Sequence, residues 1–241
     1  MFDPKKFTTP QPKPLPVVLL LDVSGSMSGS KIDNLNKAVE DMLDTFAQEE
    51  KMETEILVSV ITFGSQVDLH LPYTKASQVR WQRFQASGST PMGTAFKMAK
   101  AMIEDKNTTP SRAYRPTIVL VSDGHPTDSW KEALKDFVST GRSSKCFCMA
   151  VSIGHDADEE VLRRFIANTP FLAQNHPNKV FYAENASQLH AFFQKVTMST
   201  LLRTRSSAPN DVPAVPPDIQ LDGGSVKPNV SGSASDDDGY W

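Results

Sequence analysis

The chain has 241 residues, a net charge of −3 at neutral pH and a sequence pI of about 6.0. This length suits one globular domain with short extensions, and the charge excludes a strongly basic protein that binds nucleic acid or anionic membranes through its overall field. The longest apolar stretch, residues 16–21, is far shorter than the roughly 20 residues that span a bilayer. Residues 1–13 lack the apolar segment of a signal peptide. The two cysteines, Cys146 and Cys148, exclude a disulfide scaffold, so we expect a cytoplasmic protein.

Both ends of the chain differ in composition from its middle. Five of the 17 prolines fall in residues 1–16 and five more in residues 206–241. The second segment carries six aspartates against one lysine, a net charge of −5, so the rest of the chain carries +2. Such segments bury too little apolar area to offset the entropy of ordering them. We predict an extended Pro-rich arm over residues 1–14, a folded domain over 15–202 and a disordered acidic tail over 203–241.

The predicted domain begins with a strand and a helix. Residues 15–21 form a continuous apolar run, which is typical of a strand buried on both faces. Residues 31–50 place apolar side chains at helical spacing, which predicts an amphipathic helix. Ser30 and Asp33 stand at the positions of a capping box, with Asp in place of the usual Glu.

Two strands and a second helix follow. Residues 56–63 have the pattern of another buried strand. Residues 67–71 alternate between polar and apolar side chains, as expected of an edge strand reached through a tight turn. Residues 92–103 have helical periodicity, and Pro91 stands at a first-turn position, where its missing N–H group is tolerated.

The second half of the domain continues this alternation. The expected elements are a strand at 117–121, a helix at 129–138, a strand at 146–153, a helix at 158–167, a strand at 180–183 and a helix at 187–202. Ser129 and Glu132 are predicted to form a capping box for the first of these helices. The alternation predicts an α/β fold: a doubly wound, mostly parallel sheet with one antiparallel edge strand and helices on both faces.

Three short polar motifs stand where such a sheet binds ligands. DVSGS at residues 22–26 follows the first strand, SDG at 122–124 follows a later strand, and GSTP at 88–91 precedes a helix. In open α/β sheets, ligands bind at the carboxyl ends of the strands, where the strand order reverses. The side chains offered are hydroxyls and carboxylates, without His or Cys, and such hard oxygen donors suit Mg²⁺. Two carboxylates alone would leave the cation electrophilic and open to one more anionic ligand.

These motifs resemble the metal-ion-dependent adhesion site of von Willebrand factor A (VWA) domains, and the resemblance covers roughly residues 15–202. It implies a Rossmann-like VWA fold and a metal site made of Asp22, Ser24, Ser26, Thr90 and Asp123. In the family the three hydroxyls touch the metal directly, and the two aspartates usually act through water. The resemblance further implies Mg²⁺, with Mn²⁺ or Ca²⁺ as alternatives, and a partner protein whose Asp or Glu completes the metal shell.

The opening LPVVLLLDVSGSMSG, with SVITFGS and VSDGHPTDSW further on, is more similar still to bacterial stand-alone VWA proteins of the tellurium-resistance (TerY-like) group. This similarity implies a non-enzymatic adaptor in tellurite or other stress responses, beside a protein kinase and a PP2C-type phosphatase. Two alternatives stay open: a VWA co-factor of a MoxR-type ATPase, and a hydrolase that uses the same metal to activate water. The motifs contain no general base, and His125 beside them is expected to be a loop residue because no nucleophile is in view.

Two features outside the motifs carry further expectations. Cys146 and Cys148 share one strand face and are expected to be small core residues. Residues 231–241 combine three aspartates with two terminal aromatics, and random-coil scaling gives them a reach of roughly 30 Å from residue 203. The tail is therefore a candidate internal ligand of the metal. A solvated extension or a docking peptide for another protein is the simpler alternative, and neither a nucleic-acid nor a membrane partner is expected.

Overall fold

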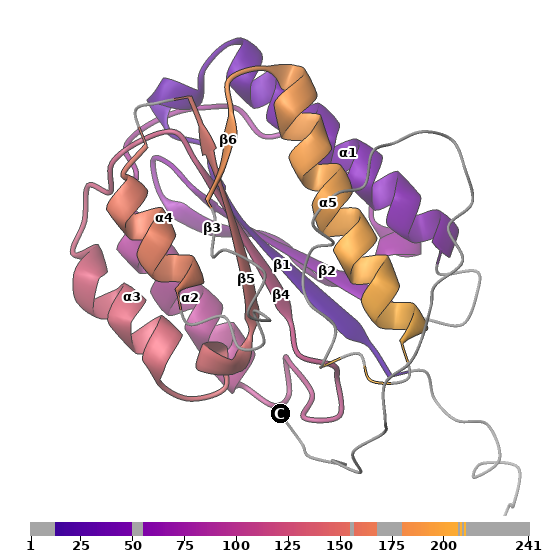
Figure 1. Cartoon of the computed structure of the whole chain (residues 1–241). Helices are drawn as coiled ribbons and strands as arrows, with labels where there is room; N and C mark the ends of the chain where they lie inside the picture. The colour runs from indigo at the N-terminus through magenta and orange to yellow at the C-terminus, as the bar shows by residue number, and fades with distance from the viewer. Residues whose placement is uncertain are drawn as a thin grey trace, which may run out of the picture.

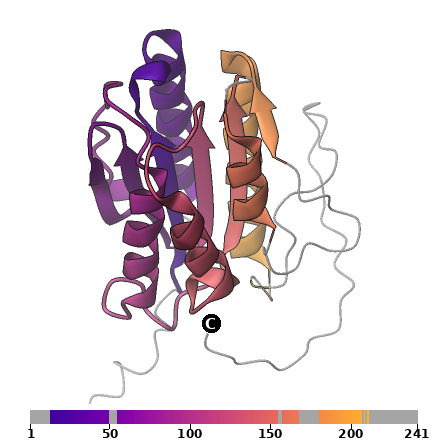
Figure 2. The same cartoon turned by 90° about the vertical axis from the view of Figure 1, so that its left-hand side faces the viewer.

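A six-stranded sheet lies at the centre of the molecule, between two layers of helices (Figure 1, Figure 2). The computed structural model describes residues 13–49, 55–154, 157–167, 180–206, 208 and 210. The strands are β1 (Leu15–Asp22), β2 (Ile56–Phe63), β3 (Val67–Lys75), β4 (Thr117–Ser122), β5 (Phe147–Ile153) and β6 (Phe181–Ala183). Their order is β3-β2-β1-β4-β5-β6, and every neighbouring pair is parallel except β2 with β3. The predicted fold class is confirmed.

Within the described ranges, five α-helices cover the two faces of this sheet. They are α1 (Ser30–Glu49), α2 (Met92–Glu104), α3 (Trp130–Ser139), α4 (Glu159–Ile166) and α5 (Ala186–Arg205). Helices α1 and α5 cover one face, and α2, α3 and α4 cover the other (Figure 1). Within β1, Val17, Leu19 and Leu21 pack toward α1 and α5, while Val18 and Leu20 pack toward α2. Because both faces are covered, β1 is apolar from Leu15 to Leu21, and each buried apolar side chain contributes about 1.5–3 kcal/mol.

Strand β3 is longer than the alternating pattern predicts. The pattern ends at Leu71, whereas β3 continues to Lys75 at the edge of the sheet. Its pairing with β2 shifts register between Val58 and Val60, where an additional residue is accommodated in β3 beside Pro72. Proline has no N–H group to donate, and an edge strand with a bulge tolerates this loss.

The helix starts do not bear out the two predicted capping boxes. Helix α1 includes Ser30 as its first residue and is preceded by Gly29, whose φ is +75°. Ser129 does precede α3, but its side chain makes no capping hydrogen bond, so this predicted box is wrong. Asp158 caps α4 by accepting hydrogen bonds from the backbone N–H groups of Glu160 and Val161.

Helix α5 extends three residues beyond the predicted domain boundary at residue 202, because Arg203 is fully buried. The Arg203 guanidinium donates to Thr117 Oγ1 (2.7 Å) and to the carbonyl oxygen of Arg115 (2.5 Å), and it lies 4.1 Å from the ring centre of Phe147. Burial lowers the pKa of Arg203 to about 9. The last turn of α5 is therefore part of the folded core.

Both ends of the described domain are held at the amino end of β4. The N–H group of Tyr114 donates to the carbonyl oxygen of Pro14 (2.9 Å), and the N–H group of Arg115 donates to Asn210 Oδ1 (3.0 Å). Residues 1–12 of the predicted arm and 211–241 of the predicted tail lie outside the described residues. Across the described ranges, no helix combines the length and the apolarity needed to cross a lipid bilayer.

The two cysteines lie where the sequence predicts them. Cys146 is 1% exposed, directly before β5, and belongs to the core under α2, α3 and α4. Cys148 is half-buried and packs against the same cluster. Burial raises the pKa of the Cys146 thiol well above its usual range, so this side chain acts as a small apolar group.

Candidate metal centre

The three polar motifs meet at the carboxyl ends of β1 and β4, the neighbouring strands at which the strand order reverses. Asp22 is the last residue of β1, and Asp123 directly follows the last residue of β4, Ser122. Since Leu21 is in register with Val121, the two aspartates leave adjacent strands at the same edge of the sheet. This is where open α/β sheets bind ligands.

Asp22 is a fully buried carboxylate whose two oxygens both accept hydrogen bonds. The backbone N–H of Ser24 donates to Oδ1 (2.9 Å), and the hydroxyl of Ser122 donates to Oδ2 (2.6 Å). Burial raises the pKa of Asp22 above its usual value, and these hydrogen bonds act in the opposite direction. The side chain is therefore held in place, and a nearby cation would offset the cost of burying its charge.

A chain of short contacts joins the serines of the first motif to Asp123. The hydroxyl oxygens of Ser24 and Ser26 lie 2.9 Å apart, and the Ser26 hydroxyl donates to Asp123 Oδ1 (2.7 Å). The other carboxylate oxygen of Asp123 lies 2.5 Å from Nζ of Lys31. Asp123 and Ser24 are buried and Ser26 is exposed, so an exposed hydroxyl connects two buried side chains.

Thr90 reaches the same place from the loop before α2. A Cβ atom added to Gly124 would lie 3.6 Å from Thr90 Oγ1 and 3.7 Å from Ser26 Oγ. The two hydroxyls therefore face one small space, which a side chain at position 124 would enter. The structure thus brings together all five residues that the VWA resemblance nominates.

The segment after β4 holds Thr90 in position. Thr127 Oγ1 accepts a hydrogen bond from the N–H of Thr90 (3.1 Å), and the N–H of Thr127 donates to the carbonyl oxygen of Thr90 (2.9 Å). The carboxylate of Asp128 accepts from the N–H groups of Gly93 and Thr94, both at 2.8 Å, at the start of α2. Neither Thr127 nor Asp128 was predicted from the sequence, although both stand in the VSDGHPTDSW segment that resembles VWA proteins.

A backbone hydrogen bond joins the DVSGS motif to the GSTP motif. The N–H of Gly25 donates to the carbonyl oxygen of Gly88 (2.9 Å). Gly88 has a φ of +78°, and a Cβ atom at this position would collide with the backbone of Ser65. Glycine is needed here both for its left-handed backbone and for the close approach of this loop to Ser65.

The donor set fits a small divalent cation. It consists of three hydroxyls and two carboxylates, all hard oxygen donors, and the hydroxyls of Ser26 and Thr90 both lie beside Gly124. Nowhere in the described residues do three or more His, Cys, Asp or Glu side chains form a metal-binding group of their own. His125 lies beside the site with its side chain 74% exposed, and its Nδ1 is 3.5 Å from a carboxylate oxygen of Asp158.

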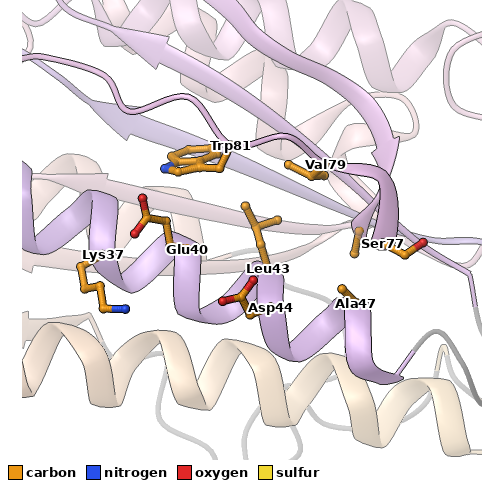
Figure 3. Close-up of a pocket in the computed structure, with 9 residues that line it drawn as sticks. Lys37, Glu40, Leu43, Asp44, Ala47, Ser77, Val79 and Trp81 are labelled. Carbon is orange, nitrogen blue, oxygen red and sulfur yellow. The ribbon is translucent and has the colours of Figure 1, made fainter.

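A groove of about 390 Å³ lies away from this edge, between α1 and the segment after β3 (Figure 3). Leu43, Val79 and Trp81 contribute its apolar surface. Two of its charged side chains are paired: Glu40 with Arg83 (2.8 Å) and Lys37 with Asp41 (2.7 Å). The edge with Asp22 and Asp123 brings together more hydroxyl and carboxylate groups that can bind a cation, so it is the stronger candidate functional site.

The chain belongs to the von Willebrand factor type A domain family, whose sequence model matches residues 17–195. It is 26% identical over 220 residues to human inter-alpha-trypsin inhibitor heavy chain H4, which covers 87% of this chain and 23% of that protein. It is also 26% identical over 223 residues to human heavy chain H2, covering 83% of this chain and 21% of the relative. The chain thus spans less than a quarter of the length of these curated relatives.

Solved structures show the same fold at low sequence identity. A von Willebrand factor type A protein from Catenulispora acidiphila superposes with a TM-score of 0.60 at 18% identity, over 78% of this chain and 43% of that one. The vWF domain of the pilus tip protein Mfa5 from Porphyromonas gingivalis superposes with a TM-score of 0.57 at 10% identity, over 81% of this chain and 98% of that one. VWA domains form a family of metal-dependent adhesion and protein-interaction modules, and this chain has their architecture.

Proposed function

We propose that this VWA domain is a protein-interaction module that binds an acidic side chain of a partner through a divalent cation. Asp22, Ser24, Ser26, Thr90 and Asp123 would hold the cation. When bound, the cation supplies a Lewis-acidic centre with a position open to a carboxylate. The observation that carries this proposal is the chain of contacts from Ser24 through Ser26 to Asp123, which faces Thr90 across Gly124.

Mg²⁺ is the proposed ion, with Mn²⁺ or Ca²⁺ as alternatives. A donor set of three hydroxyls and two carboxylates carries little charge for a divalent site. Such a set suits a small cation that keeps part of its water shell, whereas Ca²⁺ takes 6–8 oxygen ligands in its protein sites. The carboxylate of a partner would then replace one of the retained waters.

Titration calorimetry with Mn²⁺ and Mg²⁺ tests the metal centre. Wild-type protein should bind one cation, and the double variant Ser24→Ala with Ser26→Ala should lose this binding. Ser28→Ala is the matched control, because this exposed serine lies in the same loop but its hydroxyl donates only to the carbonyl oxygen of Gly25 (2.7 Å). Equal cation binding by the double variant would refute the proposed site.

The same proposal predicts a metal-dependent contact without hydrolysis. The described residues at the site include no hydroxyl hydrogen-bonded to a histidine base, and the His125 ring faces Asp158 instead. Partner binding should be sensitive to EDTA and should be lost when the partner's Asp or Glu is replaced by Asn or Gln. Phosphatase or protease activity that tracks the metal and disappears in Thr90→Ala would favour the hydrolase alternative.

The biological setting that we propose is a cytoplasmic response to tellurite or another stress, with a protein kinase and a PP2C-type phosphatase as partners. The support is the similarity of LPVVLLLDVSGSMSG and VSDGHPTDSW to TerY-like sequences. Mass spectrometry of proteins that co-purify with wild-type protein but not with Asp22→Ala tests this setting. Recovery of a MoxR-type ATPase in place of the kinase and phosphatase would overturn it.

The acidic end of the chain is proposed as an internal competitor for the same cation. Residues 236–238 are three consecutive aspartates, and tethering raises the effective concentration of a weak ligand to as much as the millimolar range. Removing the residues after Asn210 should then tighten partner binding and speed Mg²⁺ exchange. Equal partner affinity of the truncated and complete chains would show that these residues do not act as a ligand.

A further inference from the structure

Lys31 lies against the candidate metal centre although it belongs to none of the three motifs. Its Nζ is 2.5 Å from Oδ2 of Asp123, whose side chain is fully buried, while the Lys31 side chain keeps 35% of its surface exposed. Lys31 reaches this carboxylate because it is the second residue of α1, and α1 begins directly behind the loop that carries Ser24 and Ser26.

The position of Lys31 in its helix is electrostatically unfavourable. The amino end of a helix carries a partial positive charge, so a lysine in the first turn acts against helix stability, whereas an acidic residue supports it. Asp33 provides such an acidic residue in the same turn. The helix itself therefore gives no reason for a lysine at position 31, and the contact with Asp123 does.

The charges of the centre show what this contact does. Asp22 and Asp123 carry two negative charges at the edge of the sheet, and Lys31 compensates one of them. With a divalent cation, the centre would carry a net charge of +1 in the presence of the Lys31 ammonium, and would be neutral without it. A charge placed near Asp22 and Asp123 interacts strongly with them, because both carboxylates are buried and are screened little by solvent.

We propose that Lys31 is a built-in counter-cation that sets the ligand preference of the metal centre. This inference rests on the proposed metal-dependent function and adds a specificity-determining residue to it. The Lys31 ammonium repels the divalent cation and so weakens cation binding. It also keeps the loaded centre positive, which strengthens the binding of an anionic carboxylate relative to a neutral oxygen ligand. Removing its charge should therefore change the two affinities in opposite directions.

Charge-neutral and charge-conserving variants test this proposal. Lys31→Met keeps much of the length of the side chain without its charge, and Lys31→Arg keeps the charge. Lys37→Met is the matched control, since Lys37 lies on the same helix but pairs with Asp41 at the surface (2.7 Å). Mn²⁺ affinity is measured by calorimetry, and carboxylate binding by the paramagnetic relaxation of ¹³C-labelled acetate in the presence of Mn²⁺. Thermal unfolding without metal confirms that each variant folds.

Lys31→Met should raise Mn²⁺ affinity about tenfold, the effect of one unit charge at a partly exposed site, and should weaken acetate binding. Lys31→Arg and Lys37→Met should leave both affinities within about twofold of wild type. Binding of Mn²⁺ by Lys31→Met but not by wild type would also support the proposal. If wild type and Lys31→Met bind Mn²⁺ with equal affinity, the role of Lys31 is refuted and the metal centre stands. If no variant binds Mn²⁺, both proposals fall.

Discussion

Asn36 provides a sharp test of how the loop that carries Thr90 is held against α1. This asparagine is 2% exposed, and its side-chain amide donates to the carbonyl oxygens of Ile32 and Phe84, both at 3.0 Å. Its Oδ1 accepts a hydrogen bond from the N–H of Phe84 (3.2 Å). Asn36 therefore satisfies both backbone groups of Phe84, six residues before Thr90 in a segment that forms no helix or strand.

Asn36→Ala would leave two buried backbone groups of Phe84 without these partners. Each unsatisfied buried group costs about 1–3 kcal/mol, so the free energy of unfolding should fall by about 2–6 kcal/mol. For a domain of this size, a loss of about 3 kcal/mol lowers the melting temperature by roughly 6–12 °C. Asn36→Asp should be worse still, because it places a carboxylate against the two carbonyl oxygens to which the amide donates.

Urea unfolding followed by circular dichroism measures these free energies. Asn34→Ala is the matched control: the same residue type, two positions earlier in α1, with no side-chain hydrogen bond to any described residue. It should change the free energy of unfolding by less than about 0.5 kcal/mol. A loss below about 1 kcal/mol in Asn36→Ala would refute the reasoning, because a buried and fully used amide cannot be that dispensable.

Three further changes probe the positioning of the site. Asp128→Ala removes the acceptor for the first N–H groups of α2 and should lower the free energy of unfolding by about 1–2 kcal/mol. Because α2 starts beside Thr90, the variant should also bind Mn²⁺ more weakly, as measured by calorimetry. Gly88→Ala forces a left-handed backbone and a collision with Ser65, and should lower the melting temperature and Mn²⁺ affinity together. Burial raises the pKa of Asp22, so the stability of the metal-free protein should fall as the pH rises from the usual Asp pKa through this raised value. Asp22→Asn should therefore raise the melting temperature of the metal-free protein at pH 7 and abolish the stabilisation by Mn²⁺. An unchanged or lower melting temperature of the metal-free variant would contradict the destabilising role assigned to the buried charge of Asp22.

The features that the sequence predicted well are those written in local patterns. Strand β1 is apolar at every core position because helices cover both of its faces, so its run of residues is unambiguous. The five nominated site residues stand at the ends of strands or before a helix, and the sheet topology brings these ends together. Position along the chain was therefore enough to predict that Asp22 and Asp123 meet.

The features that the sequence did not predict depend on contacts between distant segments. The sequence pattern predicted a capping box at Ser129 and no role for Asp128. The Asp128 carboxylate accepts hydrogen bonds from the start of α2, a helix that ends 24 residues before Asp128 in the chain. Arg203 is a charged residue near the end of a helix, where the sequence predicts exposure to solvent. It is buried because its guanidinium contacts a carbonyl oxygen, a hydroxyl and an aromatic ring. A pattern of hydrophobic residues has no means of marking a buried arginine or a cap supplied by another segment.

Both ends of the described domain lie beside Tyr114 and Arg115, and this determines on which side of the domain a linker or another domain joins it. These two residues precede β4, whereas the candidate metal centre follows the carboxyl end of the same strand. A six-residue strand spans about 20 Å, so the chain enters and leaves on the side opposite the site. A linker, a surface or a neighbouring domain joined directly at Pro14 or Asn210 would therefore lie on the side of the domain opposite the metal edge.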